Sequence, residues 1–430
     1  MSTYRKIQNW QQPFAPIQQL KWLFFDLNSY FASVEQQENP ELFGQPVAVV
    51  PMMTDSTCAI AASYEAKAYG IKTGTKIFKA KTLCPQLKCV QARHDIYVDY
   101  HHRIFEELEN HTHVTRVCSI DEAACMLMGD ECIRENAIDL ALRIKEGLCN
   151  NIGLAITCSI GIAPNAFLAK IATDMQKPDG LVVLEPGAYK ERLFEMELRD
   201  LPGINTRMEA RLNLARIFTV EQFWNLDPKH ARQIWHNVEG ERFWYRLHGY
   251  EIPHLETHKS VVGHSRVLDP ALRHPDDAIG IARQLTVKAA ARLRRYEMYG
   301  RQFCLSVKSV DRIKWSGKRS FSPAQDNFTF VRALEEMWAE MVSDLRKKKL
   351  QKLSITIYDL YEKQDITLDL FEKAEPDQEL NTTLSSSMDR LNKRYGVNTV
   401  SMGSCPKTSG GYVGTKIAFA RIPEKEEFLE

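Results

Sequence analysis

The chain has 430 residues, of which 44% are hydrophobic and 26% charged, and this balance is that of an ordinary globular protein rather than a disordered or membrane-embedded chain. Such a length exceeds what one compact core usually serves, so roughly two to four domains are expected. The formal net charge is only +1, so an acidic partner would have to be held by local basic patches, such as those at 291–301 and 346–352.

Targeting and redox signals are absent from the sequence. No signal peptide opens the chain and no apolar run approaches the roughly 20 residues of a membrane span, so we expect a cytoplasmic protein with no membrane partner. The 10 cysteines are scattered without a CxxC pair. This argues against a zinc site or a disulfide framework and fits a reducing compartment.

The first half of the chain interleaves strand and helix patterns. After a polar arm at 1–20, we expect buried strands at 22–27, 46–51, 58–62 and 154–163. Helical patterns occupy 29–36, 63–70, 95–111, 135–151 and 164–175. Asn28 or Ser29 is expected to cap the first of these helices, and Pro164 to lie in the first turn of the last. The alternation predicts an α/β or α+β architecture.

The second half begins with short helices and then becomes mixed again. Short helices are expected over 188–250, followed by a polar linker at 251–260. The mixed region that follows has strand patterns at 260–268, 302–310 and 352–360 and helical patterns at 276–296 and 328–347. The last 70 residues are rich in Ser, Thr, Asn and Gly, and we expect them to be irregular.

Three acidic residues stand where strands are expected. Asp26 closes the first apolar strand, and Asp121 with Glu122 separates two apolar runs in "HVTRVCSIDEAACMLMG" (113–129). A buried unpaired carboxylate is costly. If the two strands are neighbours in one sheet, the three carboxylates converge on one edge, where they could bind a hard divalent cation such as Mg²⁺. On either stretch alone, a helix cap and a turn acid are the favoured interpretation, because a lone pair of adjacent acids is a weak signal.

Four segments together carry a family resemblance. The segments "FFDLNSYFASVEQ", "YEAKAYGIKTG", "SIDEA" and "AKIATDMQKPDG" occur in the order and at the intervals found in the Y-family DNA polymerases, which include DNA polymerase IV, UmuC and eta. The chain resembles this family from residue 22 to about 360. The resemblance implies an α+β multidomain right-hand fold and a low-fidelity DNA-directed DNA polymerase that extends primers past damaged bases.

The same resemblance implies a domain order. It gives a ferredoxin-like palm in two parts (21–36 and 93–185), small fingers (37–92), a helical thumb (186–250), a linker (251–260), an α/β little finger (261–360) and a C-terminal tail (361–430). The implied substrates are primer-template DNA and a dNTP. The chain is expected to act as a monomer.

The resemblance also assigns the catalytic residues. Asp26 and Asp121 would bridge two Mg²⁺ ions, with Mn²⁺ able to replace them, and Glu122 would hold the catalytic ion near the primer 3′-OH. The backbone carbonyl of Leu27 falls where the family contacts the nucleotide-side ion. Two such ions can activate an attacking hydroxyl and stabilise a pyrophosphate leaving group.

Further positions match the family's nucleotide contacts. Phe31 falls on the steric gate, where an aromatic ring fills the space that a ribose 2′-OH would need. Tyr64, Lys67 and Lys177 fall where the family contacts the triphosphate. Lys67 stands where arginine is usual and Ala61 where threonine is frequent, and both departures would weaken the grip on phosphate.

Contacts to DNA are expected from the second half of the chain. "LPGIN" (201–205) resembles the family's helix-hairpin-helix turn, with Gly203 presenting backbone N–H groups to a phosphate. Asn205 replaces the expected second glycine, and asparagine is the residue that next best tolerates the left-handed conformation. In the little finger, the candidate backbone contacts are Lys308, Lys314, Lys318 and Arg319, together with Arg312. The basic run 346–349 lies at an expected helix end, so it could either bind DNA or stabilise the end of that helix.

The tail carries a short peptide that resembles another known motif. "TLDLF" (367–371) is similar to the QLxLF-type peptides by which bacterial polymerases dock into the β sliding clamp, with Leu368, Leu370 and Phe371 as anchors. A final strand of the little finger is the alternative interpretation.

Two other classes of function compete with an active polymerase. One is an inactive Y-family paralogue that serves as a clamp-binding scaffold in a mutagenesis complex, and the retained Asp26, Asp121, Glu122, Tyr64 and Lys177 disfavour it. The other is a nucleotidyl cyclase, which needs neither a thumb motif nor a basic little finger. The sequence leaves the lesion, the inserted base, any obligatory subunit and the role of 375–430 undetermined.

Overall fold

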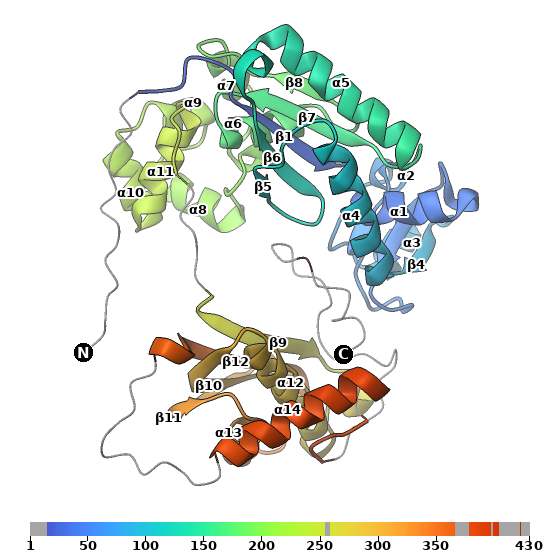
Figure 1. Ribbon diagram of the computed structural model, residues 1–430, viewed down its shortest axis with the longest axis vertical. Coiled ribbons are helices and arrows are strands. Elements are labelled where there is room, and N and C mark those ends of the chain that lie inside the picture. Colours follow the sequence, from blue (N-terminus) through green and yellow to red (C-terminus); the bar gives the residue numbers. More distant parts are fainter. Residues whose placement is uncertain (1–14, 254–258, 366–377, 397–398, 404–421, 423–430) are drawn as a thin grey trace. The chain divides into compact units, whose positions relative to one another are not determined.

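The structure is a computed structural model, and it describes residues 15–253, 259–365, 378–396, 399–403 and 422 (Figure 1). The chain divides into two compact units, the first formed by the described residues up to 253 and the second by those from 259 to 403. Each unit has its own sheets and its own hydrophobic core.

A five-stranded sheet forms the centre of the first unit. Its strand order is β5-β6-β1-β7-β8, and only the β7–β8 pair is parallel. The strands are β1 (Trp22–Leu27), β5 (Arg116–Val117), β6 (Glu122–Met126), β7 (Cys158–Ala163) and β8 (Leu181–Val183). Every residue of β1 is buried, as its nearly continuous apolar run predicts for a central strand.

Helices cover both faces of this sheet. On one face lie α4 (His94–Glu109) and α5 (Arg134–Asn151), and Phe25 of β1 meets Phe105 of α4 edge-on. On the other face lies α6 (Ala166–Met175). A Cβ at Gly161 of β7 would come within 2.1 Å of the Ala169 carbonyl, so glycine is required for α6 to lie this close to the strand that pairs with β1.

A smaller α/β segment is inserted after the first strand and helix. Helix α1 (Tyr30–Glu38) leads to a three-stranded sheet of order β3-β2-β4, which packs with two short helices around a separate core. These elements are β2 (Val47–Val50), β3 (Ala61–Ala62), α2 (Tyr64–Ala68), α3 (Ile77–Leu83) and β4 (Lys88–Gln91). Strand β3 is shorter than the expected 58–62, because Cys58 forms only an isolated bridge with Lys76.

Short helices complete the first unit. They are α7 (Lys190–Phe194), α8 (Thr206–Leu214), α9 (Val220–Trp224), α10 (Pro228–Trp235) and α11 (Val238–Leu247). Side chains cap four of them: Asn205, Thr219, Asp227 and Asn237 accept hydrogen bonds from the first-turn N–H groups of α8, α9, α10 and α11. The rings of Phe223, Trp235 and Phe243 join this helical part to the core beneath α6.

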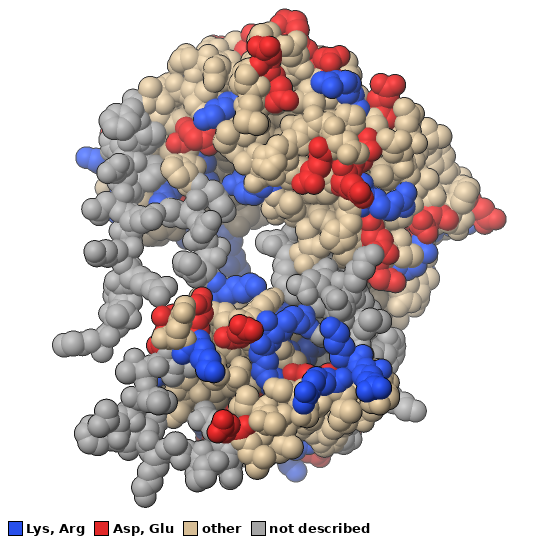
Figure 2. Space-filling view, in the orientation of Figure 1, with Lys and Arg blue, Asp and Glu red and all other residues tan. Residues whose placement is uncertain are grey.

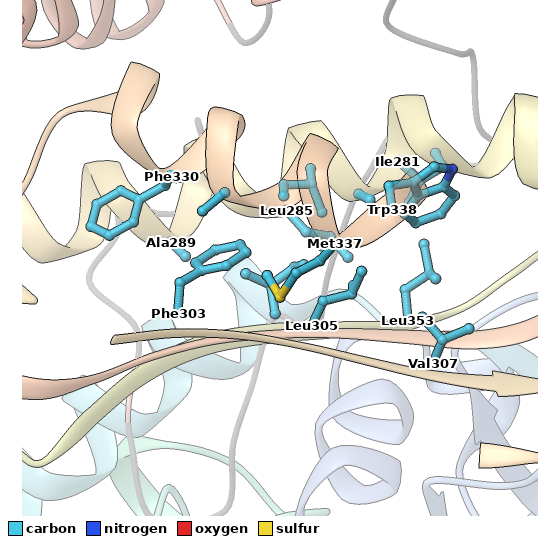
Figure 3. Close-up of a cluster of buried hydrophobic side chains, with 14 of the residues drawn as sticks. Ile281, Leu285, Ala289, Phe303, Leu305, Val307, Phe330, Met337, Trp338 and Leu353 are labelled. Carbon is cyan, nitrogen blue, oxygen red and sulfur yellow. The ribbon is translucent and has the colours of Figure 1, made fainter. Parts of the chain in front are cut away.

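The second unit is a four-stranded antiparallel sheet with helices on one face. Its order is β11-β10-β12-β9, formed by β9 (Val261–Val267), β10 (Met298–Ser309), β11 (Lys314–Ala324) and β12 (Leu350–Glu362). Helices α12 (Pro275–Arg295) and α13 (Asn327–Asp344) pack on it. Phe303, Leu305 and Val307 point into the core that Figure 3 shows, and polar residues alternate with them.

The expectation that the last 70 residues are irregular is wrong for one segment. Helix α14 spans Gln378–Tyr395 and packs on α12 and α13. Its contacts to the unit are polar. Arg294 of α12 donates to both carboxylate oxygens of Asp389 at 2.7 and 2.9 Å, and the Asn327 N–H donates to Ser385 Oγ at 2.9 Å. Apolar residues do recur at helical spacing in α14, but Leu380, Leu384, Leu391 and Tyr395 are exposed rather than packed on the unit.

Two expected helix starts also differ in detail. Pro164 lies before the cap of α6, where Asn165 accepts from the Leu168 N–H. Ser29 occupies the cap position of α1 with φ +50° and makes no side-chain cap bond.

The 3-10 turns are Pro40–Leu42, Gly129–Cys132, Leu198–Asp200, Pro270–Leu272 and Lys363–Asp365. The cysteines of the described ranges are free thiols, and no helix in those ranges is long and apolar enough to cross a membrane.

Candidate active site

The two acidic segments of the sequence meet on adjacent strands. Asp26 of β1 is the direct cross-strand partner of Glu122 of β6, and the Leu27 N–H donates to the Asp121 carbonyl at 2.9 Å. Direct partners in an antiparallel pair project to the same face of the sheet. The two strands that carry the acids are therefore neighbours in one sheet, as a shared site requires.

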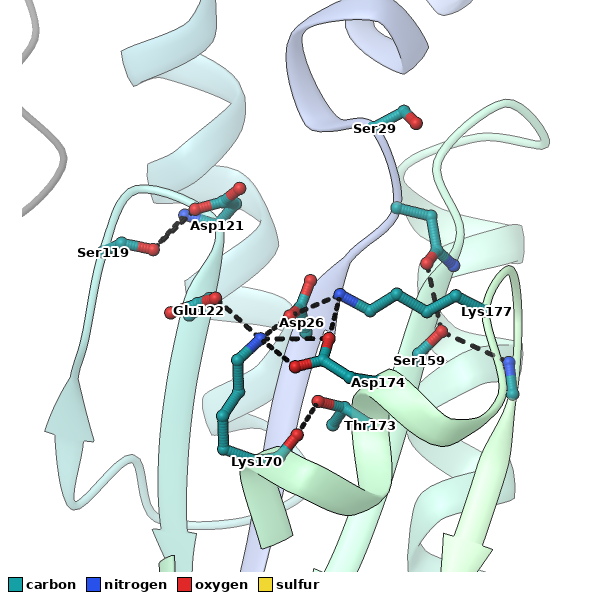
Figure 4. Close-up of polar contacts among 12 residues, drawn as sticks. Asp26, Ser29, Ser119, Asp121, Glu122, Ser159, Lys170, Thr173, Asp174 and Lys177 are labelled. Carbon is teal, nitrogen blue, oxygen red and sulfur yellow. Dashed lines mark hydrogen bonds and ion pairs between the residues drawn. The ribbon is translucent and has the colours of Figure 1, made fainter. Parts of the chain in front are cut away.

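Two lysines lie among these carboxylates (Figure 4). Lys170 of α6 forms ion pairs with Asp26, with Glu122 at 2.9 Å and with Asp174 at 3.4 Å. Lys177 pairs with Asp26 at 2.7 Å and with Asp174 at 2.9 Å. Asp26 is 4% exposed, so its charge depends on these cations in the structure as it stands.

Burial acts on two of the carboxylates despite the lysines. Burial raises the pKa of Asp121, partly opposed by the Ser119 hydroxyl, which donates to Asp121 Oδ1 at 2.5 Å, and the charge of Asp26 raises it further. Burial likewise raises the pKa of Glu122, against the effect of Lys170. Burial alone would lower the pKa of Lys170, but Asp26, Asp174 and Glu122 together raise it above its ordinary value.

The donor set fits a hard divalent cation, although the side chains do not converge on one point. Asp26 and Glu122 meet at the Lys170 ammonium, whereas the Asp121 carboxylate turns to Ser119 (Figure 4). Among the described residues, no group of three or more His, Cys, Asp or Glu is arranged to hold a metal. The residues present are nevertheless oxygen donors of the kind that Mg²⁺ prefers. Asp26 and Glu122 lie close enough to share one ammonium group, so a cation between them would reduce their repulsion.

Next to the carboxylates lies a group of residues suited to phosphate. Lys67 of α2 donates to Ser29 Oγ at 2.7 Å, and its ammonium lies 4.1 Å from the centre of the Tyr64 ring. The Tyr64 hydroxyl donates to Asn28 Oδ1 at 3.4 Å. Burial lowers the pKa of Lys67, and the nearby Lys177 lowers it further. Two cations that repel each other in this way would both gain from a bound anion.

Phe31 lies at the start of α1 beside this group. Its ring is partly exposed and stacks on Tyr97 of α4, with 4.3 Å between ring centres and 13° between ring planes. The structure therefore places Phe31, Tyr64, Lys67 and Lys177 around the same strand end as the carboxylates.

Sequence reasoning missed two residues of this site. Lys170 and Asp174 lie in the same segment as Lys177, yet neither is among the predicted site residues. Part of the signal is present in the sequence, because Lys170 and Asp174 lie at positions i and i+4 and so share one face of α6, whereas Lys177 lies beyond the end of this helix at Met175. A helix from 166 to 175 that covers β1 would bring that face to Asp26.

A second candidate surface is the open face of the sheet in the second unit. Lys308 of β10 is the cross-strand partner of Lys314 on β11 and of Lys352 on β12. Like charges directly opposite each other destabilise a sheet, so this row of three lysines favours an anionic ligand. Lys352 is not among the predicted contacts. Lys318 lies on the same face, opposite Cys304, with its ammonium 5.6 Å from the Tyr358 ring centre.

Two predicted DNA contacts have other surroundings. Arg319 points to the helix-covered face and forms ion pairs with Glu336, at 3.4 Å, and Glu340 of α13. This argues against a role for Arg319 on the open face. Gly203 has φ +99°, as a tight turn requires, whereas Asn205 has φ −93° and caps α8. Asn205 therefore does not use the left-handed conformation that asparagine tolerates.

On the visible face of the second unit, Lys and Arg side chains gather over α12 and α14 (Figure 2). Although the net charge of the chain is only +1, its positive side chains therefore form a local patch, as the sequence indicates.

The clamp-binding peptide, with Leu368, Leu370 and Phe371, lies outside the described residues.

Acids on neighbouring strands of an α+β sheet, beside cations suited to phosphate, are the arrangement of an enzyme that transfers nucleotidyl groups. The comparisons with known proteins specify the class. Residues 25–174 match the impB/mucB/samB family, and residues 258–370 match the C-terminal domain of that family. The chain belongs to this family, the Y-family translesion DNA polymerases, and is a DNA-directed DNA polymerase.

Individual relatives agree with this assignment. DNA polymerase IV of Moorella thermoacetica is 31% identical over 391 residues, which cover 88% of this chain and 94% of the relative. DNA polymerase IV 1 of Bacillus subtilis is 28% identical over 395 residues, covering 89% and 92%. Membership of the family implies dependence on a divalent metal.

Solved structures show the same fold. A Y-family polymerase chimera of Dbh and Dpo4 aligns with a TM-score of 0.68 at 24% identity, over 80% of this chain and 99% of the chimera. An insertion ternary complex of Dbh DNA polymerase aligns with a TM-score of 0.52 at 25% identity, over 80% and 99%. The α+β multidomain polymerase fold expected from the sequence is confirmed.

Proposed function

We propose that this enzyme extends primers past damaged template bases with low fidelity, using two Mg²⁺ ions held by Asp26, Asp121, Glu122 and the Leu27 carbonyl, with Mn²⁺ able to replace them. The observation that carries the proposal is the direct pairing of Asp26 with Glu122, with Asp121 on the adjoining turn. Three acids are held in one region against their mutual repulsion, and burial raises the pKa of two of them.

When bound, the ions would activate the primer hydroxyl and neutralise charge on the leaving pyrophosphate. The residues of the chain position the substrates. Lys67, Lys177 and Tyr64 bind the triphosphate of the incoming dNTP, and Phe31 rejects a ribose 2′-OH. Lys170 balances the carboxylates between turnovers, because it forms ion pairs with two of them.

We propose that the open face of the sheet in the second unit binds DNA. The row Lys314–Lys308–Lys352, with Lys318 beside it, would contact the phosphates of the primer-template duplex, and the turn at Gly203 would contact a further phosphate. The row favours an anionic ligand through its like-charge pairs, and small polar side chains such as Ser306 and Ser316 lie next to it.

These roles define the domains of the proposed enzyme. The palm comprises 21–36 and 93–185, the fingers 37–92, the thumb 186–250 and the little finger 261–360. The three-stranded sheet and its separate core support the fingers, and the capped short helices support the thumb.

Primer extension on matched undamaged and lesion-bearing templates tests the proposal. We expect incorporation opposite at least one class of damaged base and misincorporation on the undamaged template. An inactive scaffold would extend neither template, and a polymerase that stops one base before every lesion would contradict the bypass function.

The tail adds a proposed partner. Leu368, Leu370 and Phe371 would dock into a bacterial β sliding clamp and raise the local concentration of the enzyme at the primer end. The double variant Leu370→Ala, Phe371→Ala is expected to lose stimulation by a loaded clamp while keeping clamp-free extension. Undiminished stimulation would exclude this segment as the tether, and loss of clamp-free activity would indicate a strand of the fold instead.

A further inference from the structure

The ring of Phe31 is held by a second aromatic ring. Phe31 is the second residue of α1, and Ser29, two residues earlier, has φ +50°. The Phe31 ring lies flat on Tyr97, which is completely buried, at 4.3 Å between ring centres. His94, one turn earlier on α4, meets the same ring edge-on at 6.2 Å. Phe31 therefore has a rigid wall on the side formed by α4.

Tyr97 is itself fixed from two directions. Its hydroxyl donates to Glu35 Oε1 at 2.6 Å, and its backbone carbonyl accepts from the Tyr30 hydroxyl at 2.5 Å. Glu35 is 1% exposed, and Arg93 donates to its carboxylate through Nε at 3.1 and 3.2 Å and through Nη2 at 2.5 Å. A buried carboxylate with a charged, forked donor is among the stronger polar contacts in proteins.

These residues connect α1 and α4 through two sets of contacts, one helical turn apart. Phe31 and Glu35 are four residues apart on α1, and Arg93 and Tyr97 are four residues apart at the start of α4, so each pair shares one helix face. The first set is the ring stack, and the second set is the Glu35–Arg93 pair with the Tyr97 hydroxyl. The orientation of the Phe31 ring is thereby tied to a buried charge network.

We propose that Tyr97 is a positioning residue for sugar discrimination: through its stacked ring and its bond to Glu35, it keeps Phe31 from yielding to a ribose 2′-OH. The inference rests on the proposed role of Phe31 as the steric gate. A steric block discriminates only if the blocking group cannot move aside, and a ring in the first turn of a helix is otherwise free to rotate. Tyr97 removes that freedom without touching the nucleotide.

The test compares dNTP and rNTP incorporation opposite the same template base. Discrimination is defined as kcat/KM for the dNTP divided by kcat/KM for the rNTP. Tyr97→Leu removes the stacked ring and should lower discrimination by roughly 3- to 10-fold, the range expected for an aromatic pair. Tyr97→Phe keeps the ring and loses only the bond to Glu35, so a decrease of about twofold is expected. Incorporation of the dNTP should change less than incorporation of the rNTP in both variants.

A neighbouring tyrosine provides a matched control. Tyr100 lies on the same helix, and its hydroxyl donates to Glu38 Oε1 of α1 at 2.7 Å. Tyr100→Phe removes an equivalent bond between the same two helices away from Phe31. Discrimination should remain that of the wild type in this variant, whereas a general loosening of the helix pair would lower it as much as Tyr97→Phe does.

A double-mutant cycle separates this inference from the proposed gate. Phe31→Ala alone should lower discrimination strongly, and adding Tyr97→Leu should lower it no further, because the positioned ring is gone. Unchanged discrimination in Phe31→Ala would overturn the gate itself. If Phe31→Ala lowers discrimination while Tyr97→Leu and Tyr97→Phe do not, or if the effects of Phe31→Ala and Tyr97→Leu multiply, the positioning role is overturned. Should Tyr97→Leu fail to fold, Tyr97→Phe against Tyr100→Phe decides.

Discussion

Lys170 is the residue that most changes the interpretation of the active site. The sequence indicates three acids and a need for metal, but Lys170 already lies among Asp26, Glu122 and Asp174. A buried charge that loses its partner is far more costly than an exposed one. The lysine therefore allows the carboxylates to stay close together before metal and nucleotide arrive.

Replacing this lysine should make stability depend on metal. Lys170→Met keeps the aliphatic chain and removes the charge, so the metal-free protein should lose about 3 kcal/mol of unfolding free energy. Mg²⁺ should restore part of that loss, because ligands that bind only the folded state stabilise it by mass action. The measurement is thermal unfolding with and without Mg²⁺.

The matched control is another lysine of the same unit. Lys145 donates to Asp179 Oδ1 at 2.6 Å and to the Cys158 carbonyl at 2.7 Å, away from the three acids. Lys145→Met should lower stability without raising the response to Mg²⁺ above that of the wild type. If Mg²⁺ stabilised Lys170→Met no more than the wild type, Lys170 would not be the group that compensates the acids without metal. If Mg²⁺ stabilised neither protein, the three acids would not be a metal site.

Burial of His101 predicts that the fold is sensitive to acid next to the turn that carries Asp121. The ring is 4% exposed, its Nδ1 lies 2.7 Å from the Ile120 carbonyl, and burial lowers its pKa to about 4 from an ordinary 6.5. Between pH 6.5 and about 4, His101 is therefore protonated in the unfolded chain and neutral in the folded chain. Stability should be fully present above about pH 6.5 and should fall by about 3 kcal/mol as the pH drops through 4.

Chemical unfolding at a series of pH values measures this effect. His101→Gln keeps a donor for the Ile120 carbonyl and does not titrate, so its unfolding free energy should change less between pH 6.5 and 4 than that of the wild type. His102→Gln, at the exposed neighbouring position, is the control. Identical pH slopes for wild type and His101→Gln would show that His101 is not held neutral.

At the scale of elements, the sequence predicts best where a regular pattern coincides with burial. The run "WLFFDL" and the long periodic helices α4, α5, α12 and α13 are found where they are expected, within a few residues. Strand β11 carries only Lys and Ser on its exposed positions and has Gly317 and Pro323 at half-buried ones, so its sequence has no clear strand pattern. Helix α14 escapes the prediction because its Ser, Thr and Asn content indicates an irregular segment, although Leu380, Leu384, Met388 and Leu391 recur at helical spacing. Its polar contacts to the unit are made by Asp389 and Ser385.

The site shows the same limit. Motif spacing could place Asp26, Asp121, Glu122, Phe31, Tyr64, Lys67 and Lys177 in one region. Neither the side-chain pairing of Lys170 nor the stack of Phe31 on Tyr97 follows from local sequence, because each joins residues more than 60 positions apart. Such contacts depend on which helix covers which face of the sheet.

The open sheet of the second unit carries a prediction for DNA binding. Lys314 and Lys318 lie on its exposed face, so Lys314→Glu with Lys318→Glu should weaken binding to all DNA sequences alike. The slope of log K against log salt concentration should become shallower by about 1 for each phosphate that the protein no longer neutralises. Fluorescence anisotropy on a primer-template at several salt concentrations measures both effects.

Arg319 provides the control on the same strand. It points to α13 and pairs with Glu336 and Glu340, so Arg319→Gln should leave the salt slope unchanged. A strong preference of the wild type for one duplex sequence, or an equal effect of Arg319→Gln, would exclude the open face as a phosphate-tracking surface.

At the scale of the whole molecule, the proposed catalytic residues and the proposed row of DNA-binding lysines lie in different units. The carboxylates and the phosphate-suited cations lie in the first unit, whereas the row of lysines lies in the second. Each unit has its own core, so a change in one should leave the other folded. Variants of the catalytic acids should therefore bind DNA normally, and variants of the lysine row should retain the chemical step on DNA that is already bound.

The most direct test of the central claim is single-turnover incorporation of one nucleotide by Asp121→Asn and Glu122→Gln on a saturating primer-template with Mg²⁺. Both substitutions keep the size of the side chain and remove its charge. We expect the rate to fall on the order of 10³-fold or more in each variant, with DNA affinity close to that of the wild type. Asp139→Asn, at an exposed site paired with Arg143, should be unaffected. Incorporation near the wild-type rate by either variant would contradict the assignment of Asp26, Asp121 and Glu122 as the catalytic carboxylates.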